Sequence, residues 1–142
     1  MSEQAVPDQA CEMKDVEVLG GVTPYLQLDG ASKAAEFYVR AFDAMEMMRV
    51  PPDEKGRYMH IHLYLNGGSL MLTDCFPEHG HPHEKAQGYT LHLQVEDVDL
   101  PWKRAVDAGC EVIVPVQRMF WGHRYGIIRD PFGVTWSIAS VK

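Results

Sequence analysis

The sequence lacks the features that would place it among membrane or secreted proteins. Its longest apolar runs extend over only a few residues, far short of the roughly 20 that a membrane-spanning helix needs. The first twenty residues carry acidic side chains and no apolar stretch, so we expect no secretory signal. We therefore expect no membrane partner.

Positive charge and cysteine are also scarce. The chain has 13 Lys and Arg residues against 20 Asp and Glu, a formal net charge of −7, and its basic residues are scattered. This pattern predicts that the protein binds no nucleic acid. Its three cysteines, Cys11, Cys75 and Cys110, are odd in number and form no CxxC pair. They indicate reduced thiols, and a cytoplasmic protein, rather than a disulfide framework.

Several catalytic signatures are missing as well. The sequence contains no GxSxG nucleophile elbow, no P-loop and no GxGxxG turn before a helix. These absences argue against serine-hydrolase chemistry and against the common nucleotide-binding folds.

What the sequence does contain is one pattern written twice. Residues 1–20 predict a flexible acidic arm, and residues 21–142 one domain. Within it, module one covers about 21–74 and module two 89–141, with a connector at 75–88. Each module predicts a strand, an amphipathic helix and three further strands, because apolar residues recur first at a period of 2 and then at 3.6. The helices are expected in 'ASKAAEFYVRAF' and 'DVDLPWKRAVDAG'.

Local signals define the ends of these elements. Each helix has alternative N-capping side chains, namely Asp29 or Ser32 for the first and Asp97 or Asp99 for the second. The sequence 'DPFG' at 130–133 has the residue preferences of a type I turn joining the last two strands. The periodicity places Trp102 and Trp136 in the core.

Five segments in order resemble the vicinal oxygen chelate superfamily, which includes glyoxalase I, bleomycin-resistance proteins and extradiol dioxygenases. They are 'TPYLQL', 'AAEFYVRAFDA', 'MHIHLYL', 'DVDLPWKRAVDAGCEVIVPV' and 'FWGHRYGIIRDPFGVTWSIA'. The likeness is strongest to its PhnB-like branch. The resemblance implies an α+β fold in which two βαβββ modules form curved mixed sheets with helices on the convex side. It also implies homodimers in which modules pair to complete two cups.

The period-2 pattern then assigns side chains to the two faces of the sheets. One set faces the helices: Leu26, Leu28, Leu70, Leu72, Leu91, Leu93, Val95, Trp136 and Ile138. The other set faces the cup: Thr23, Tyr25, Gln27, His60, His62, Tyr64, Thr90, His92, Gln94 and Ser137.

The metal-ligand positions that the resemblance implies fall on Thr23, Met71, Thr90 and Ser137. None of these is a plausible ligand for a divalent cation, so we expect no metal and no other cofactor. An alternative is a divalent metal ion held by a non-standard set, His60, His62 and His92. The tract 'HGHPHE' at 79–84 lies in the connector and is interpreted as a solvated loop.

The cup is expected to hold a small organic ligand. Aromatic rings stack on planar molecules, and an arginine can hold an anionic group through two hydrogen bonds. The alternative for Arg124 is a salt bridge to Asp130. The candidate ligand-binding residues are Tyr25, Gln27, His60, His62, Tyr64, His92, Trp121, His123 and Arg124.

The predicted function is binding of a small, aromatic or planar molecule without the standard metal site, of the sequestration or resistance type. The alternative is an enzyme of the lyase, isomerase or dioxygenase type. It would use a histidine metal site or a histidine as general acid or base. The sequence leaves open whether any reaction is catalysed.

Overall fold

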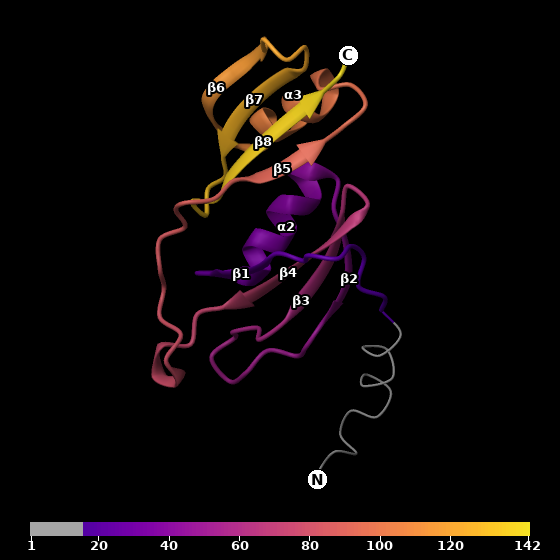
Figure 1. The fold of residues 1–142 in the computed structure, drawn as a ribbon. Helices are drawn as coiled ribbons and strands as arrows, with labels where there is room; N and C mark the ends of the chain where they lie inside the picture. The colour runs from indigo at the N-terminus through magenta and orange to yellow at the C-terminus, as the bar shows by residue number, and fades with distance from the viewer. Residues whose placement is uncertain (1–15) are drawn as a thin grey trace.

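The computed structural model describes residues 16–142 and shows the two modules following each other along the chain (Figure 1). Module one consists of β1 (Tyr25–Leu28), α2 (Ala31–Phe42), β2 (Met45–Arg49), β3 (Ile61–Leu65) and β4 (Gly68–Asp74). A short 3₁₀ helix, η2 (Pro77–His79), lies in the connector. Module two consists of β5 (Leu91–Gln94), α3 (Asp99–Ala108), β6 (Glu111–Arg118), β7 (Arg124–Arg129) and β8 (Thr135–Ser140). The predicted α+β fold with two βαβββ modules is confirmed.

Each module forms a four-stranded mixed sheet with the same topology. The strand orders are β1-β4-β3-β2 and β5-β8-β7-β6, and in each sheet the first pair is parallel and the other two are antiparallel. The register places Tyr25 beside Met71 in module one, and His92 beside Ser137 in module two. Each pair joins the first strand of a module to its last strand, so Tyr25 and Met71 in module one correspond to His92 and Ser137 in module two.

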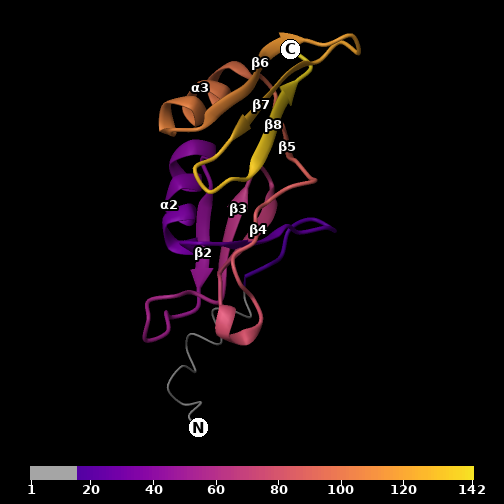
Figure 2. The same ribbon diagram turned by 90° about the vertical axis from the view of Figure 1, so that its left-hand side faces the viewer.

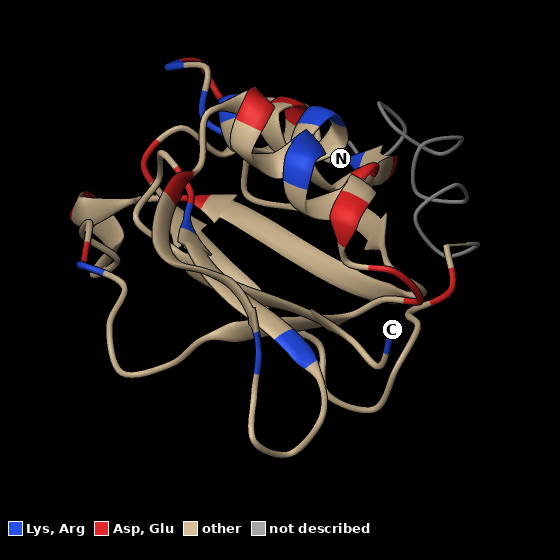
Figure 3. Cartoon of the chain, turned by 90° about the horizontal axis from the view of Figure 1, so that it is seen from above, with Lys and Arg blue, Asp and Glu red and all other residues tan. Residues whose placement is uncertain are grey.

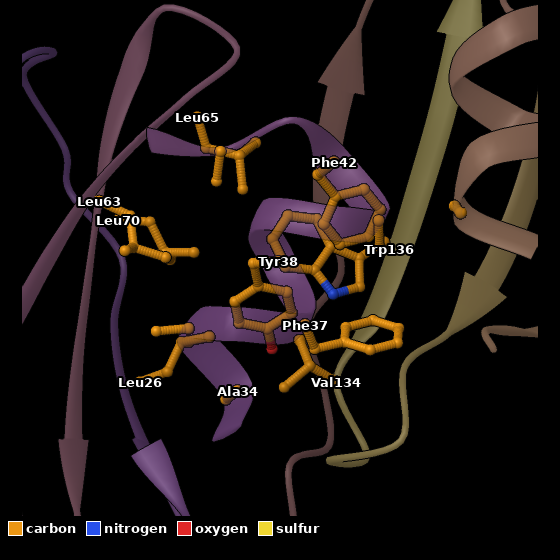
Figure 4. Packing of buried hydrophobic residues seen from close by; sticks show 14 of the residues in the cluster. Leu26, Ala34, Phe37, Tyr38, Phe42, Leu63, Leu65, Leu70, Val134 and Trp136 are labelled. Carbon is orange, nitrogen blue, oxygen red and sulfur yellow. The ribbon is translucent and has the colours of Figure 1, made fainter. Parts of the chain in front are cut away.

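The two helices cover the same face of the molecule, and the sheets lie behind them (Figure 2). The leucines predicted to face the helices are buried or partly buried, and Ile138 is fully buried. Trp136 of β8 packs against α2 of the other module, with ring centroids 4.4 Å from Phe42 and 5.4 Å from Tyr38 (Figure 4). The modules thus share one apolar core. The core placement of Trp136 is confirmed, and Trp102 is partly buried against that core.

The turn 'DPFG' is a hairpin turn, as predicted, because the Gly133 amide donates to the Asp130 carbonyl. Its aspartate has a second role that the turn pattern does not reveal. The buried Asp130 carboxylate accepts hydrogen bonds from the Tyr38 hydroxyl and from Trp136 Nε1. Since Tyr38 belongs to α2, this carboxylate joins the two modules.

The predicted helix caps are wrong for α2 and incomplete for α3. Neither Asp29 nor Ser32 caps α2; instead Asp74 Oδ1, at the end of β4, accepts from the Gly30 and Ala31 amides. For α3, the Ser140 hydroxyl at the end of β8 accepts from the Val98 amide, while Asp97 accepts from the Asp99 amide. In both modules the last strand therefore supplies the cap of its helix.

Charged residues lie mainly on the helices and loops rather than on the body of the sheets (Figure 3). Within the strands, every charged residue except Glu46 occupies the first or last position. The central parts of both sheets are therefore uncharged on the face that points away from α2 and α3. Among residues 16–142, no helix is both long enough and apolar enough to span a membrane.

Candidate functional site

The candidate site lies on the cup face, defined here as the face of the two sheets opposite α2 and α3. In module one, Tyr25 and three alternating residues near and within β3 lie on this face: His60, His62 and Tyr64. Their rings contact one another edge to face, with centroids 5.4 Å apart for Tyr25 and His60 and for His62 and Tyr64. The predicted grouping of these four side chains is therefore present.

Each of these side chains has a defined hydrogen-bond partner. The Tyr25 hydroxyl lies 2.7 Å from His60 Nδ1 and 3.2 Å from the Met59 carbonyl oxygen. His62 Nε2 lies 2.7 Å from Ser69 Oγ, and only 2% of His62 is exposed. Burial lowers the pKa of both histidines, and for His62 a charge on His60 adds to the effect. Both rings are therefore neutral at physiological pH.

The segment that precedes β1 crosses this face of module one (Figures 1 and 2). The Glu17 carbonyl accepts from the Tyr64 hydroxyl, and the Leu19 amide donates to Ser69 Oγ. The Ser69 amide in turn donates to the Leu19 carbonyl. Residues 17–19 thus contact the sheet directly, although the sequence assigned them to the arm. His62 is consequently buried, and Tyr64 is partly covered.

In module two, the cup face carries an aromatic ladder, defined as His92, Tyr125 and Trp121. The His92 and Tyr125 rings stack with centroids 6.1 Å apart and an angle of 20°, and Trp121 meets Tyr125 edge-on at 5.9 Å. Trp121 is 48% exposed. This ladder extends from the β6–β7 loop across the sheet to β5.

Both ring nitrogens of His92 are engaged. Nδ1 lies 2.7 Å from Ser137 Oγ, and Nε2 lies 2.9 Å from Gln94 Oε1. Because an amide oxygen only accepts, Nε2 carries the proton and Nδ1 accepts from Ser137. His92 is therefore held in one orientation by its neighbours.

Gln27 occupies the cup face beside Tyr25, but its side chain bonds to the connector. Its Nε2 donates to the Pro82 carbonyl at 2.5 Å. A cavity of about 350 Å³ opens next to it, between the β1–β4 pair and the connector. Its lining residues are Tyr25, Gln27, Met59, Thr73, Asp74, Phe76 and His81.

The alternative metal set does not assemble. Within residues 16–142, no three His, Cys, Asp or Glu side chains lie together in a way that could hold a metal ion. His60, His62 and His92 are instead bonded to Tyr25, Ser69, Ser137 and Gln94. The histidines of the tract at 79–84 are exposed, as expected for a solvated loop.

Two of the four metal-ligand positions expected from the resemblance lie outside the strands. Thr23 and Thr90 precede β1 and β5, and the residues that lie beside Met71 and Ser137 are Tyr25 and His92. Of the four side chains at these central positions, only His92 is a common ligand of divalent metals. The donor set is therefore a poor match for a divalent cation.

The alternative for Arg124, a salt bridge to Asp130, is wrong. Its guanidinium lies 2.6 Å from Asp99 Oδ1 of α3 and does not contact Asp130. Arg124 shares a face of β7 with Gly126, and a Cβ at Gly126 would meet Trp102 of α3. Arg124 is therefore on the helix side, away from the cup face. The hydrogen bond to Asp99 raises the pKa of Arg124 and lowers that of Asp99.

His123 lies in the loop just before β7, and its backbone carbonyl accepts a hydrogen bond from the Met119 amide. Sequence reasoning missed Tyr125 and Ser69, which hold the ladder and His62 in place. The alternation within 'HRYGIIR' was the available signal for Tyr125. It places the Tyr125 side chain on the face of the strand opposite to Gly126 and Ile128. For Ser69 the available signal was its alternation with Leu70, while its contact with Leu19 joins residues 50 positions apart.

The repeated modules and the uncharged polar cup face define a two-module α+β protein with an open sheet surface on one side. The Glyoxalase/Bleomycin resistance protein/Dioxygenase superfamily model matches residues 22–138, and the chain belongs to this superfamily.

The chain is similar to several bacterial proteins. It is 39% identical over 136 residues to the Mycobacterium bovis protein Mb0911c, which covers 87% of this chain and 84% of that protein. The crystal structure of PA1353 from Pseudomonas aeruginosa matches with a TM-score of 0.71 at 26% identity, over 85% of this chain and 97% of that one. The PhnB protein from Bacillus cereus matches with a TM-score of 0.66 at 21% identity, over 85% and 99%, and shares the fold.

Proposed function

We propose that this protein binds a small planar organic molecule on its cup face and sequesters it without chemical change. The observation that carries the proposal is the aromatic ladder. Trp121 stands half exposed at its outer end and contacts Tyr125, which stacks on His92 of β5. A partly exposed ring that is braced from behind offers a stacking surface at little conformational cost.

The charge of the surface supports a neutral or weakly polar ligand. Apart from Glu46, charged residues within the strands stand at strand ends, and Arg124 is bonded to Asp99 on the helix side. The loss of Arg124 from the site removes the expected anion-binding group. Stacking and hydrogen bonds are the interactions that remain to hold a ligand.

Sequestration is favoured over metal-dependent catalysis by the chemistry of the side chains at the central positions. A thioether, a neutral hydroxyl and a phenol accompany His92 there, and His92 already uses both ring nitrogens. One observation favours the second candidate, an enzyme using histidine as acid or base: His60 has a ring nitrogen without a protein partner among the described residues.

Two further expectations belong to this proposal. The segment likeness to the PhnB-like branch, together with the shared fold of the Bacillus cereus protein, supports placing the chain in that branch. The edge strands β1 and β5 each lack a neighbour on one side within the described residues, which supports a homodimer because open edges favour pairing. Sedimentation velocity should then show a species of twice 16.1 kDa; a purely monomeric protein at micromolar concentration would contradict the dimer.

The test is a ligand screen followed by calorimetry. Planar antibiotics and aromatic metabolites are titrated into the full chain, and the mixtures are analysed for products. For a ligand that binds, Trp121→Ala should weaken binding by about 1–3 kcal/mol, the range for loss of one stacking partner. Trp121→Phe is the matched control, because it keeps a ring at that position, and it should lose less.

Three outcomes separate the candidates. Binding without product supports sequestration. Turnover that survives chelation would establish the acid–base enzyme in its place. Binding that is unchanged in Trp121→Ala would show that the aromatic ladder is not the binding surface.

A further inference from the structure

The hydrogen bonds around His60 fix which of its ring nitrogens carries the proton. The Tyr25 hydroxyl contacts both His60 Nδ1 and the Met59 carbonyl oxygen, at 2.7 and 3.2 Å. A tyrosine has one proton to donate, and a carbonyl oxygen can only accept. Both contacts are hydrogen bonds at the same time when Tyr25 donates to Met59 and accepts from Nδ1–H of His60. In neutral His60 this arrangement leaves Nε2 as an unprotonated acceptor.

That acceptor is open on the cup face. Among residues 16–142, no buried side-chain nitrogen or oxygen lacks a hydrogen-bond partner. His60 Nε2 has no partner there, and His60 is only partly buried. The other two cup histidines differ: His62 is buried beneath Ser69 and Tyr64, and His92 uses both nitrogens. His60 is therefore the cup histidine with an accessible lone pair.

The cavity beside His60 presents mainly apolar surface, and neither Lys nor Arg is among its lining residues. Tyr25 and Met59, the residues that hold it, are 52% and 64% exposed and line the cavity of about 350 Å³ beside β1. The one carboxylate of that cavity, Asp74, is buried and accepts from the amides of Gly30, Ala31 and Tyr58. Such a site fits an aromatic body with a hydrogen-bond donor and holds no Lys or Arg to balance an anion.

We propose that His60 Nε2 is a ligand-recognition group that selects neutral aromatic molecules bearing a hydroxyl donor, of the phenol class. Tyr25 and the Met59 carbonyl are the positioning groups, because they hold the ring in the tautomer that accepts. The inference rests on the proposed function and names the class of ligand for the module-one part of the cup face, whereas the aromatic ladder belongs to module two.

The first experiment needs no ligand. Long-range ¹H–¹⁵N spectra of the full-length protein with ¹⁵N-labelled histidine distinguish the two neutral tautomers, and His60→Gln assigns the signal. We expect the Nδ1–H form for His60 in the wild type, with a shift toward the Nε2–H form in Tyr25→Phe. A wild-type His60 in the Nε2–H form overturns the proposal.

The second experiment measures selection. Calorimetry compares 4-ethylphenol, its methyl ether and 4-ethylbenzoate on the wild type, on His60→Phe and on Tyr25→Phe, with His79→Ala, an exposed histidine outside the site, as the matched control. The wild type and the control should prefer the phenol over the ether by about three- to tenfold, as expected for one hydrogen bond. Both site variants should lose that preference and keep their affinity for the ether.

The outcomes distinguish this inference from the proposed function. Equal affinity for phenol and ether, or tighter binding of the benzoate, overturns the selection by His60 while leaving a planar-ligand site intact. A correct tautomer together with no binding of any planar molecule in the screen overturns the proposed function, and the selection with it.

Discussion

Replacing Asp130 by asparagine should destabilise the whole domain, because this buried carboxylate joins the two modules. Oδ1 accepts from the Phe132 and Val134 amides, and Oδ2 accepts from the Tyr38 hydroxyl and Trp136 Nε1. Asparagine has almost the same shape but offers one oxygen and one NH₂ group. The NH₂ group of the asparagine would then face one of these two pairs of donors and could not accept from them.

The magnitude follows from the two bonds lost. Hydrogen bonds to a charged group contribute about 1.5–3 kcal/mol each, so we expect Asp130→Asn to lower the free energy of unfolding by about 3 kcal/mol. For a chain of 142 residues this corresponds to a fall in Tm of roughly 10 °C. Because domains of this size have about 5–15 kcal/mol of stability, the variant should still fold.

Urea unfolding and calorimetry provide the assay. Asp107→Asn is the matched control, because Asp107 lies exposed on α3 and pairs only with Lys103; its effect should stay below about 0.5 kcal/mol. A double-mutant cycle with Tyr38→Phe then measures the link between the modules, and we expect a coupling energy of at least about 0.5 kcal/mol. Strictly additive effects, or a loss in Asp130→Asn no larger than in the control, would refute the argument.

Two further predictions concern packing and pH. Gly126→Ala should destabilise the protein by about 1–3 kcal/mol, because the new methyl group would lie 2.6 Å from Trp102 atoms; Gly21→Ala, with open space around it, should have little effect in the same thermal melt. The lowered pKa of buried His62 means that the unfolded chain binds a proton more readily than the native one. Stability should therefore fall as pH drops below about 6.5, and His62→Gln should reduce that loss; an equal pH dependence in both proteins would contradict the assignment.

The sequence by itself determined the secondary structure, the repeat and the faces of the strands. Alternation placed His62 and Tyr64 opposite Leu63, and a 3.6-residue period placed Tyr38 and Phe42 on one side of α2. These are local properties, because the backbone geometry of a strand or helix fixes the direction of each side chain relative to its near neighbours. The turn at 'DPFG' was predictable for the same reason.

Only the tertiary structure decided which polar groups are partners. Asp74 caps a helix more than 40 residues earlier in the chain, Asp130 bonds Tyr38 across 92 residues, and Arg124 bonds Asp99 rather than Asp130. Such pairs depend on strand register and on how the two modules pack. Neither can be predicted from the periodicity of the sequence. The proton position on His60 belongs to the same class. It is set by a tyrosine and a carbonyl that the fold brings to one ring, and the residue type leaves both tautomers available.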